Sequence, residues 1–174
     1  MILKSLREKS NQKHINKLLS SRESGADDSK IDTLGIILNS SEFIDFEAFR
    51  ELASQLKINP NKTKIIAFTE DDKEVDGSRE MLFSPKQIGW KTKIKNPELQ
   101  DFLKKQFDAL ICFYNEENVI LDLVTALSKA KFKIGTAKHD ERLYDLIIET
   151  ANQEFELFKT ELVKYLNILK KIKE

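Results

Sequence analysis

The clearest pattern in the chain is an apolar run, a polar break and an amphipathic segment between residues 107 and 135. Ala109–Tyr114 is almost uninterruptedly apolar, as expected of a strand that is covered on both faces. Asn115–Asn118 then suits a helix start, and apolar residues recur at helical spacing as far as Leu127. Phe132–Gly135 reads as the next strand. Two strands joined by one covering helix form a βαβ unit, which requires parallel strands and a right-handed crossover.

The same alternation of apolar runs and amphipathic stretches continues on both sides of this unit. It predicts strands at Ile31–Leu38, Lys64–Phe68 and Tyr144–Glu149, and helices at Phe46–Leu56 and Gln153–Lys173. The predicted fold is therefore a three-layer α/β/α sandwich with a mainly parallel sheet of about five strands, plus an N-terminal helix. We expect five isoleucines to be deeply buried in one sheet: Ile36, Ile66, Ile111, Ile134 and Ile147.

Two segments between the second and third of these strands are polar. Thr69–Arg79 holds five acids and predicts a mobile surface loop, because its acidic spacing does not match a calcium-binding EF-hand. Lys91–Lys95 alternates polar and apolar residues, which predicts an exposed edge strand, and Trp90 is expected to cover the end of a core. A helix should follow from Asn96, because Asn, Pro and Glu in succession suit a first turn.

The N-terminal 22 residues contain six Lys or Arg and one acid, with apolar residues at imperfect helical spacing. They predict a basic, loosely amphipathic helix, followed by a linker rich in Ser, Gly and Asp. We expect residues 1–24 to lie outside a single α/β domain formed by residues 25–174. Three roles are open for this helix: packing on the domain, contact with a second subunit in a homodimer, or contact with nucleic acid or a membrane surface.

Composition narrows these roles. The 174 residues have a formal net charge of zero, so general attraction to nucleic acid or to an anionic membrane is not expected. No apolar run approaches the roughly 20 residues that span a bilayer, and no secretory signal is visible, so the expected compartment is the cytoplasm. The single cysteine, Cys112, lies inside an apolar strand and is expected to act as a small buried hydrophobic residue.

Sequence motifs for catalysis and cofactor binding are missing. The chain has no GxxxxGK[ST], GxGxxG, GxSxG, HExxH or CxxC pattern, so we predict no cofactor and no metal site. Parallel sheets nevertheless bind ligands at the C-terminal ends of their strands. The loops expected there supply eight ligand-binding candidates: Asn39, Ser40, Glu70, Asp71, Asn115, Glu116, Lys138 and His139. Histidine ordinarily titrates near neutrality, and Asp140 or Glu116 could orient the ring of His139.

The leading hypothesis is therefore a small cytoplasmic α/β module that binds a small ligand or a protein without catalysis. The alternative is a small enzyme that acts on a polar or phosphorylated substrate, sugar-like or nucleotide-like, at the C-terminal edge of the sheet. Missing phosphate-loop and nucleophile motifs favour the first hypothesis.

The stretch from Phe107 to Thr150 resembles an uncharacterised family of short α/β proteins found mainly in Bacteroidota. The basic N-terminal helix and the long closing helix are similar too, so the resemblance covers most of the chain. That family has no assigned activity, and the resemblance implies no catalytic residues. Phe107–Phe113 and Phe132–Gly135 also resemble a strand–helix–strand unit in the N-terminal half of heptosyltransferase-type glycosyltransferases, which would imply a sugar-nucleotide substrate.

Overall fold

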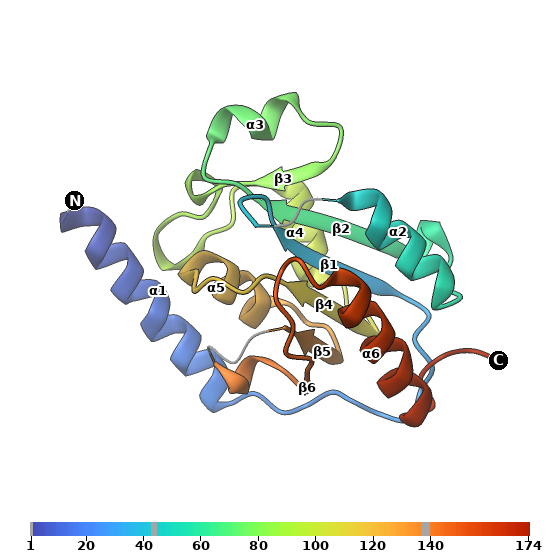
Figure 1. Ribbon diagram of the computed structural model, residues 1–174. Helices are drawn as coiled ribbons and strands as arrows, with labels where there is room; N and C mark the ends of the chain where they lie inside the picture. Colours follow the sequence, from blue (N-terminus) through green and yellow to red (C-terminus); the bar gives the residue numbers. More distant parts are fainter. Residues whose placement is uncertain (1, 43–44, 137–139) are drawn as a thin grey trace.

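A computed structural model describes residues 2–42, 45–136 and 140–174, and its centre is a six-stranded sheet in which all paired strands are parallel (Figure 1). The strands are β1 (Leu34–Asn39), β2 (Thr63–Phe68), β3 (Met81–Phe83), β4 (Ala109–Phe113), β5 (Phe132–Gly135) and β6 (Leu146–Ile147). Their order across the sheet is β3-β2-β1-β4-β5-β6. The predicted α/β fold is confirmed, with six strands where about five were expected.

Helices cover both faces of the sheet. They are α1 (Ile2–Ser20), α2 (Phe46–Gln55), α3 (Asp72–Gly77), α4 (Pro97–Lys104), α5 (Val119–Leu127) and α6 (Phe155–Ile168), with short 3₁₀ turns η1 (Pro60–Lys62), η2 (Pro85–Gln87), η3 (Trp90–Thr92) and η4 (Glu141–Leu143). One apolar core joins α2 and α6 to one face, and a second joins α1, α4 and α5 to the other. This arrangement is the predicted three-layer sandwich.

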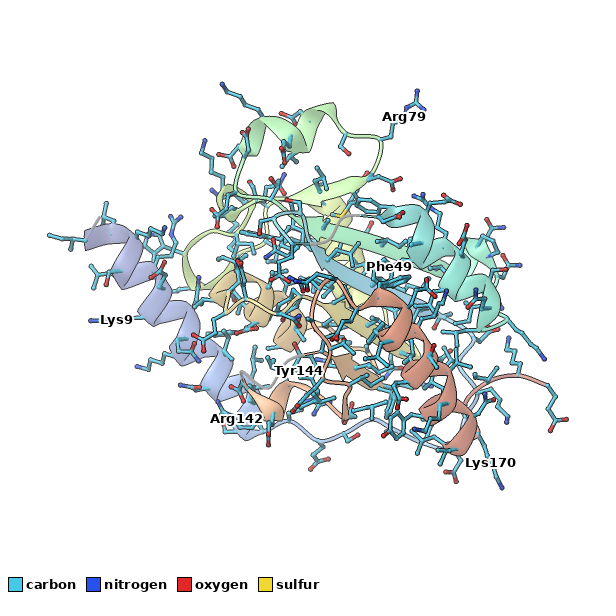
Figure 2. All side chains as sticks on the ribbon, viewed as in Figure 1. Lys9, Phe49, Arg79, Arg142, Tyr144 and Lys170 are labelled. Atoms are coloured by element: carbon cyan, nitrogen blue, oxygen red, sulfur yellow. The ribbon has the colours of Figure 1, made fainter. Side chains whose placement is uncertain are left out.

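The core between α2, α6 and the sheet is built on aromatic side chains. Phe49 of α2 lies between the helices and the sheet (Figure 2), with its ring centroid 5.4 Å from that of Phe113 and 5.0 Å from that of Phe155. Phe113 also meets Phe158 at 5.0 Å. These edge-to-face contacts each contribute about 0.5–1.5 kcal/mol beyond the area buried. They fix the end of β4, where a ligand site was expected.

Side chains at the helix starts explain where three helices begin. Asp45 accepts a hydrogen bond from the Ala48 N–H (3.0 Å), and Asn96 accepts one from the Glu98 N–H (2.9 Å). Asn118 caps α5 by accepting from the backbone N–H groups of its second and third residues (3.0 and 3.1 Å). Each cap satisfies donors that have no partner within the helix. The helix starts expected at Asp45, Asn96 and Asn115–Asn118 are therefore as predicted.

The region between β2 and α4 differs from the prediction. Thr69–Arg79 is not a loop throughout, because Asp71 caps the short helix α3 by accepting from the Lys73 N–H (2.9 Å). Strand β3 follows and was missed, since three residues are too few to show a period. Lys91–Lys95 is not an edge strand: the positive φ of Lys91 (53°) breaks extended structure, and only one antiparallel bridge forms, between Ile88 and Ile94.

Three further predictions about burial and length are wrong in part. Trp90 is 53% exposed and covers no core, because the turn it begins points it outward. Ile147 is only half-buried, since it lies in the two-residue edge strand β6, whereas the other four isoleucines are fully buried. The final helix ends at Ile168, short of the predicted Lys173, because Lys170 adopts a positive φ of 56°.

Helix α1 packs on the domain through its C-terminal half. Ile15 and Leu19 are buried in the core that contains α4 and α5. Just beyond the helix, Arg22 forms an ion pair with Asp145 at 2.7 Å. The N-terminal end projects past the body of the molecule (Figure 1), and Ile2 there is 79% exposed. Within the described residues, no helix is long and apolar enough to cross a lipid bilayer.

Candidate functional site

The strand order reverses between β1 and β4, which lie side by side at the centre of the sheet. From β1 the chain passes outward through β2 to β3, and from β4 it passes outward the other way. In open parallel sheets, ligands bind beyond the carboxyl ends of the strands at such a reversal. The segments that flank it here start with Asn39, the last residue of β1, and with Tyr114, the first residue after β4. They contain four of the eight residues predicted from sequence.

Glu42 fills the space between these two loops. One oxygen of its carboxylate accepts a hydrogen bond from the backbone N–H of Asn115, and the other accepts one from that of Glu116, both at 2.7 Å. Asn39 donates from its amide to the same carboxylate at 3.4 Å. Two successive backbone N–H groups are the kind of donor that binds external anions in other parallel sheets. In this structure an internal carboxylate occupies that place.

Asn115 joins three segments at the sheet edge. Its amide nitrogen donates to the carbonyl of Thr150 (2.9 Å), and its amide oxygen lies 2.7 Å from the hydroxyl of Thr136, at the end of β5. Asn115 therefore holds the ends of β4 and β5 and the segment before α6 together. Ser40 donates its backbone N–H to the Phe68 carbonyl (2.9 Å), which continues the pairing of β1 with β2.

The other predicted residues lie farther out. Asp71 caps α3 and has a local structural role. Lys138 and His139 lie outside the described residues. Asp140, expected to orient His139, forms an ion pair with Arg142 at 2.7 Å, and this guanidinium lowers the pKa of the Asp140 carboxyl. Of the six ligand-binding candidates that lie within the described residues, Glu70 lines a large cavity on the α1 side of the sheet edge, and Asp140 lines it too.

This cavity has a volume of about 740 Å³ and lies between α1 and the C-terminal ends of the strands. One face of α1, including Leu3, Arg7, Asn11 and Ile15, forms the first wall. These positions recur every four residues, as expected for one side of a helix. The second wall comes from loops after β2, β3 and β5 and from the first turn of α5. On the strand side, the lining of the cavity therefore comes from the segments that follow β2, β3, β4 and β5, on both sides of β1.

Asn11 is the most unusual residue of the cavity. It is only 3% exposed, it lines the cavity, and among the described residues nothing donates to or accepts from its side-chain amide. Its amide atoms are not among the fully enclosed polar atoms that lack a partner, so they face the cavity within reach of solvent. Sequence reasoning missed Asn11 because α1 lies outside the alternating pattern and a lone Asn in a basic helix carries no signal.

A buried hydroxyl cluster supports the second wall. The Tyr114 hydroxyl donates to the Asp122 carboxylate (3.0 Å) and accepts from the Tyr144 hydroxyl (3.2 Å). Burial raises the pKa of both tyrosines well above 10, so they remain neutral donors. Tyr144 lies beside η4 (Figure 2), and its ring packs so closely on Gly135 that an added Cβ would come within 2.6 Å. This contact requires glycine at the end of β5.

Two reactive groups beneath this cluster are sealed from solvent. Cys112 is fully buried, as expected, and burial raises the pKa of its thiol to about 12. Lys133 is 4% exposed, and burial lowers the pKa of its ammonium group to about 8. That ammonium group donates to the Thr125 carbonyl in the last turn of α5 (2.7 Å), where a positive charge is favourable. Lys133 therefore has a structural explanation as a helix cap.

The order β3-β2-β1-β4-β5-β6, with helices on both faces, makes the molecule a Rossmann-like α/β protein. Within the described part of the chain, no group of three or more His, Cys, Asp or Glu side chains could hold a metal ion. The chain belongs to DUF6913, a family of unknown function whose model matches residues 7–169. Most of α1 falls inside this match. Comparison with curated proteins and comparison with solved structures each gave no match.

Proposed function

We propose that this protein is a small cytoplasmic ligand-binding module, of a family found mainly in Bacteroidota, without catalytic activity of its own. Its binding site would be the cavity between α1 and the C-terminal ends of the strands. The observation that carries the proposal is Asn11, a buried amide without a partner among the described residues, at the wall of a cavity placed where parallel sheets bind ligands.

The volume and lining of the cavity support a small organic ligand. About 740 Å³ lies within the 300–1,000 Å³ range of small-molecule sites. Apolar side chains such as Ile15 and Ile120 alternate with polar ones such as Asn11 and Asn118 around it. A ligand in the cavity could supply the Asn11 amide with the hydrogen-bond partner that the described residues do not provide.

The buried groups beneath the cavity support a role without catalysis. The most nucleophilic side chain, Cys112, is sealed and held neutral by its raised pKa. The Lys133 ammonium group is engaged by a helix carbonyl. Tyr114 and Tyr144 are held as neutral hydrogen-bond donors, which suits positioning of Asp122 more than proton transfer.

An enzyme acting on a phosphorylated or sugar-nucleotide substrate is the second candidate, and the likeness to heptosyltransferase-type enzymes favours it. Its substrate phosphate would be expected at the backbone N–H groups of Asn115 and Glu116. The Glu42 carboxylate now occupies both donors and would repel a phosphate, so this candidate requires Glu42 to move.

We also propose a homodimer contact through the exposed end of α1. Ile2, Leu3 and Leu6 are 79%, 71% and 49% exposed, and a second subunit would cover them. This contact and the ligand site share the same helix, and Leu3 belongs to both, whereas Ile2 and Leu6 lie outside the cavity lining.

The variant Asn11→Leu tests the ligand site, because leucine has a similar size and no polar group. The free variant should stay folded with a stability close to that of the wild type, since the Asn11 amide makes no hydrogen bond to the described residues that the substitution could remove. The wild type is first screened for a rise in melting temperature with pools of amino acids, polyamines, organic acids, sugar phosphates and nucleotides, and the compound that gives the largest rise is the best probe. Asn11→Leu should show no such rise with that probe.

Asn167→Leu is the matched control, since Asn167 is exposed on α6 and the substitution raises helix propensity equally. It should keep the thermal shift. If the best probe raises the melting temperature of Asn11→Leu as much as that of the wild type, the proposed site is wrong.

A further inference from the structure

The two walls of the cavity carry opposite charge. The basic side chains of the lining, Lys4 and Arg7, both come from α1. Among the described residues, the charged groups of the strand-end wall are all acidic, and they include Glu70, Asp122 and Asp140. Glu8 is the one acidic residue that α1 contributes to the cavity lining, and it is exposed.

Within the part of the chain that the structure describes, no ion pair joins these walls. Among the described residues, Lys4 and Arg7 have no carboxylate within ion-pair distance, although Arg7 is half-buried and lines the same cavity as four strand-end carboxylates. Asp140 pairs instead with Arg142, and Asp122 accepts from Tyr114. The cavity thus separates an arginine that has no acidic partner from a row of carboxylates.

Resting on the proposed function, we infer that the ligand of this cavity is a zwitterion of the amino-acid and short-peptide class. Its carboxylate would bind the Arg7 guanidinium, whose planar fork matches two oxygens, and its ammonium group would face the strand-end carboxylates. A simple anion would meet the acidic wall, and a simple amine would leave Arg7 unpaired. Leu3, Ile15, Val119 and Ile120 offer apolar surface for the side chain of such a ligand.

Asn11 fits this ligand from the same helix as Arg7. Its amide can donate to a carboxylate and accept from an ammonium group, so either end of a zwitterion satisfies it. Arg7 and Asn11 are one helical turn apart on the same wall, which places both groups within reach of one small molecule.

The test compares four probes on the full chain by isothermal titration calorimetry: L-leucine, L-leucyl-L-leucine, 4-methylpentanoate and isoamylamine. The last two are leucine without its ammonium group and without its carboxylate. We expect a zwitterionic probe to bind at least tenfold more tightly than both single-charge analogues. The result that overturns the inference is equal or tighter binding of either analogue, or no heat with any probe.

Variants locate the binding. Arg7→Met and Glu70→Gln should each weaken binding of the zwitterionic probe about ten- to hundredfold, the range for charge-assisted hydrogen bonds. Lys9→Met is the control, because Lys9 points away from the body of the molecule (Figure 2) and should leave the affinity unchanged. Unchanged affinity in Arg7→Met would also overturn the inference.

These experiments distinguish a wrong prediction of the ligand's chemistry from a wrong prediction of the site. If a single-charge analogue binds best and Asn11→Leu abolishes that binding, the cavity is the ligand site and the zwitterion inference is wrong. If the best probe binds Asn11→Leu as well as the wild type, the proposed site itself is wrong and the inference falls with it.

Discussion

Replacing Lys133 with methionine should change how the stability of this protein depends on pH. Lys133 is almost fully buried, and burial lowers the pKa of its ammonium group from 10.5 to about 8. Methionine has a similar length and no charge, so Lys133→Met removes the titrating group and keeps most of the packing. It also removes the hydrogen bond to the Thr125 carbonyl, a loss of about 1 kcal/mol. A neutral amine can still donate to a carbonyl, so this loss is present on both sides of the Lys133 pKa.

The size of the effect follows from linkage. Between pH 8 and 10.5 the unfolded wild type holds the Lys133 proton while the folded protein has lost it, so its stability rises with pH. A difference of 2.5 pKa units corresponds to about 3 kcal/mol between pH 7 and 10.5. The variant lacks this rise. Its stability relative to the wild type should therefore fall by about 3 kcal/mol across that range.

Cys112 shapes the wild-type curve in the opposite direction. Burial raises its thiol pKa from 9.0 to about 12, so above pH 9 the unfolded chain loses a proton that the folded protein keeps, and stability falls. The two effects nearly cancel from pH 9 to 10.5, which leaves a net wild-type rise of about 1 kcal/mol between pH 7 and 9. Lys133→Met should instead lose stability from pH 9 upward.

Urea unfolding at pH 7, 8, 9 and 10 measures these curves, and Lys129→Met, at an exposed neighbouring lysine, is the control. The variant-minus-wild-type difference is the decisive quantity, because surface groups contribute equally to both proteins. Cys112 does not cancel fully, since the Lys133 charge lowers the pKa of its thiol and the variant lacks that charge. A difference that stays constant with pH, or one that the control reproduces, would refute the argument that burial withholds a proton from Lys133.

One substitution and one deletion test the sheet edge and the domain boundary. Glu42→Ala should destabilise the protein by about 2–3 kcal/mol in urea, because the N–H groups of Asn115 and Glu116 lose their acceptor, whereas Glu51→Ala on the exposed side of α2 should not. The enzyme candidate requires the N–H groups of Asn115 and Glu116 to bind an anion. If they do, inorganic phosphate should restore part of the stability that Glu42→Ala loses. Deleting residues 1–24 should leave a domain that is folded by circular dichroism but about 3–6 kcal/mol less stable, since Ile15 and Leu19 lose their burial. The same deletion should halve the mass measured by light scattering if α1 forms a dimer contact, and an unfolded product would show that the boundary is misplaced.

The central βαβ unit was predictable because each of its parts has a strong local period. The strands at residues 109–113 and 132–135 and the helix at 119–127 were all expected within a residue or so. Strand β3 was not, because Met81–Phe83 is too short for alternation to show. At Lys91–Lys95 the alternation was present, but the positive φ values of Lys91 and Thr92 do not follow from a polar-apolar pattern.

The site was predictable only as a region. Parallel topology placed Asn39 and Asn115 at one edge, but what joins them is Glu42, which is 73 residues away from Asn115 in sequence. In the same way, Asn11 lies at the cavity only because of where α1 packs on the domain. Single polar residues of this kind acquire their role from tertiary contacts, which no local pattern encodes.

Because α1 forms a whole wall of the cavity, the folding of this helix onto the domain and the occupancy of the cavity are thermodynamically linked. A ligand that binds only the docked form, at a concentration 100 times its dissociation constant, would favour docking by about 2.7 kcal/mol. Residues 21–30, the tether that leads from α1 to the first strand, would then be cut more slowly by protease in the presence of ligand. The rate of that cleavage offers a readout of occupancy that requires no knowledge of the ligand's chemistry.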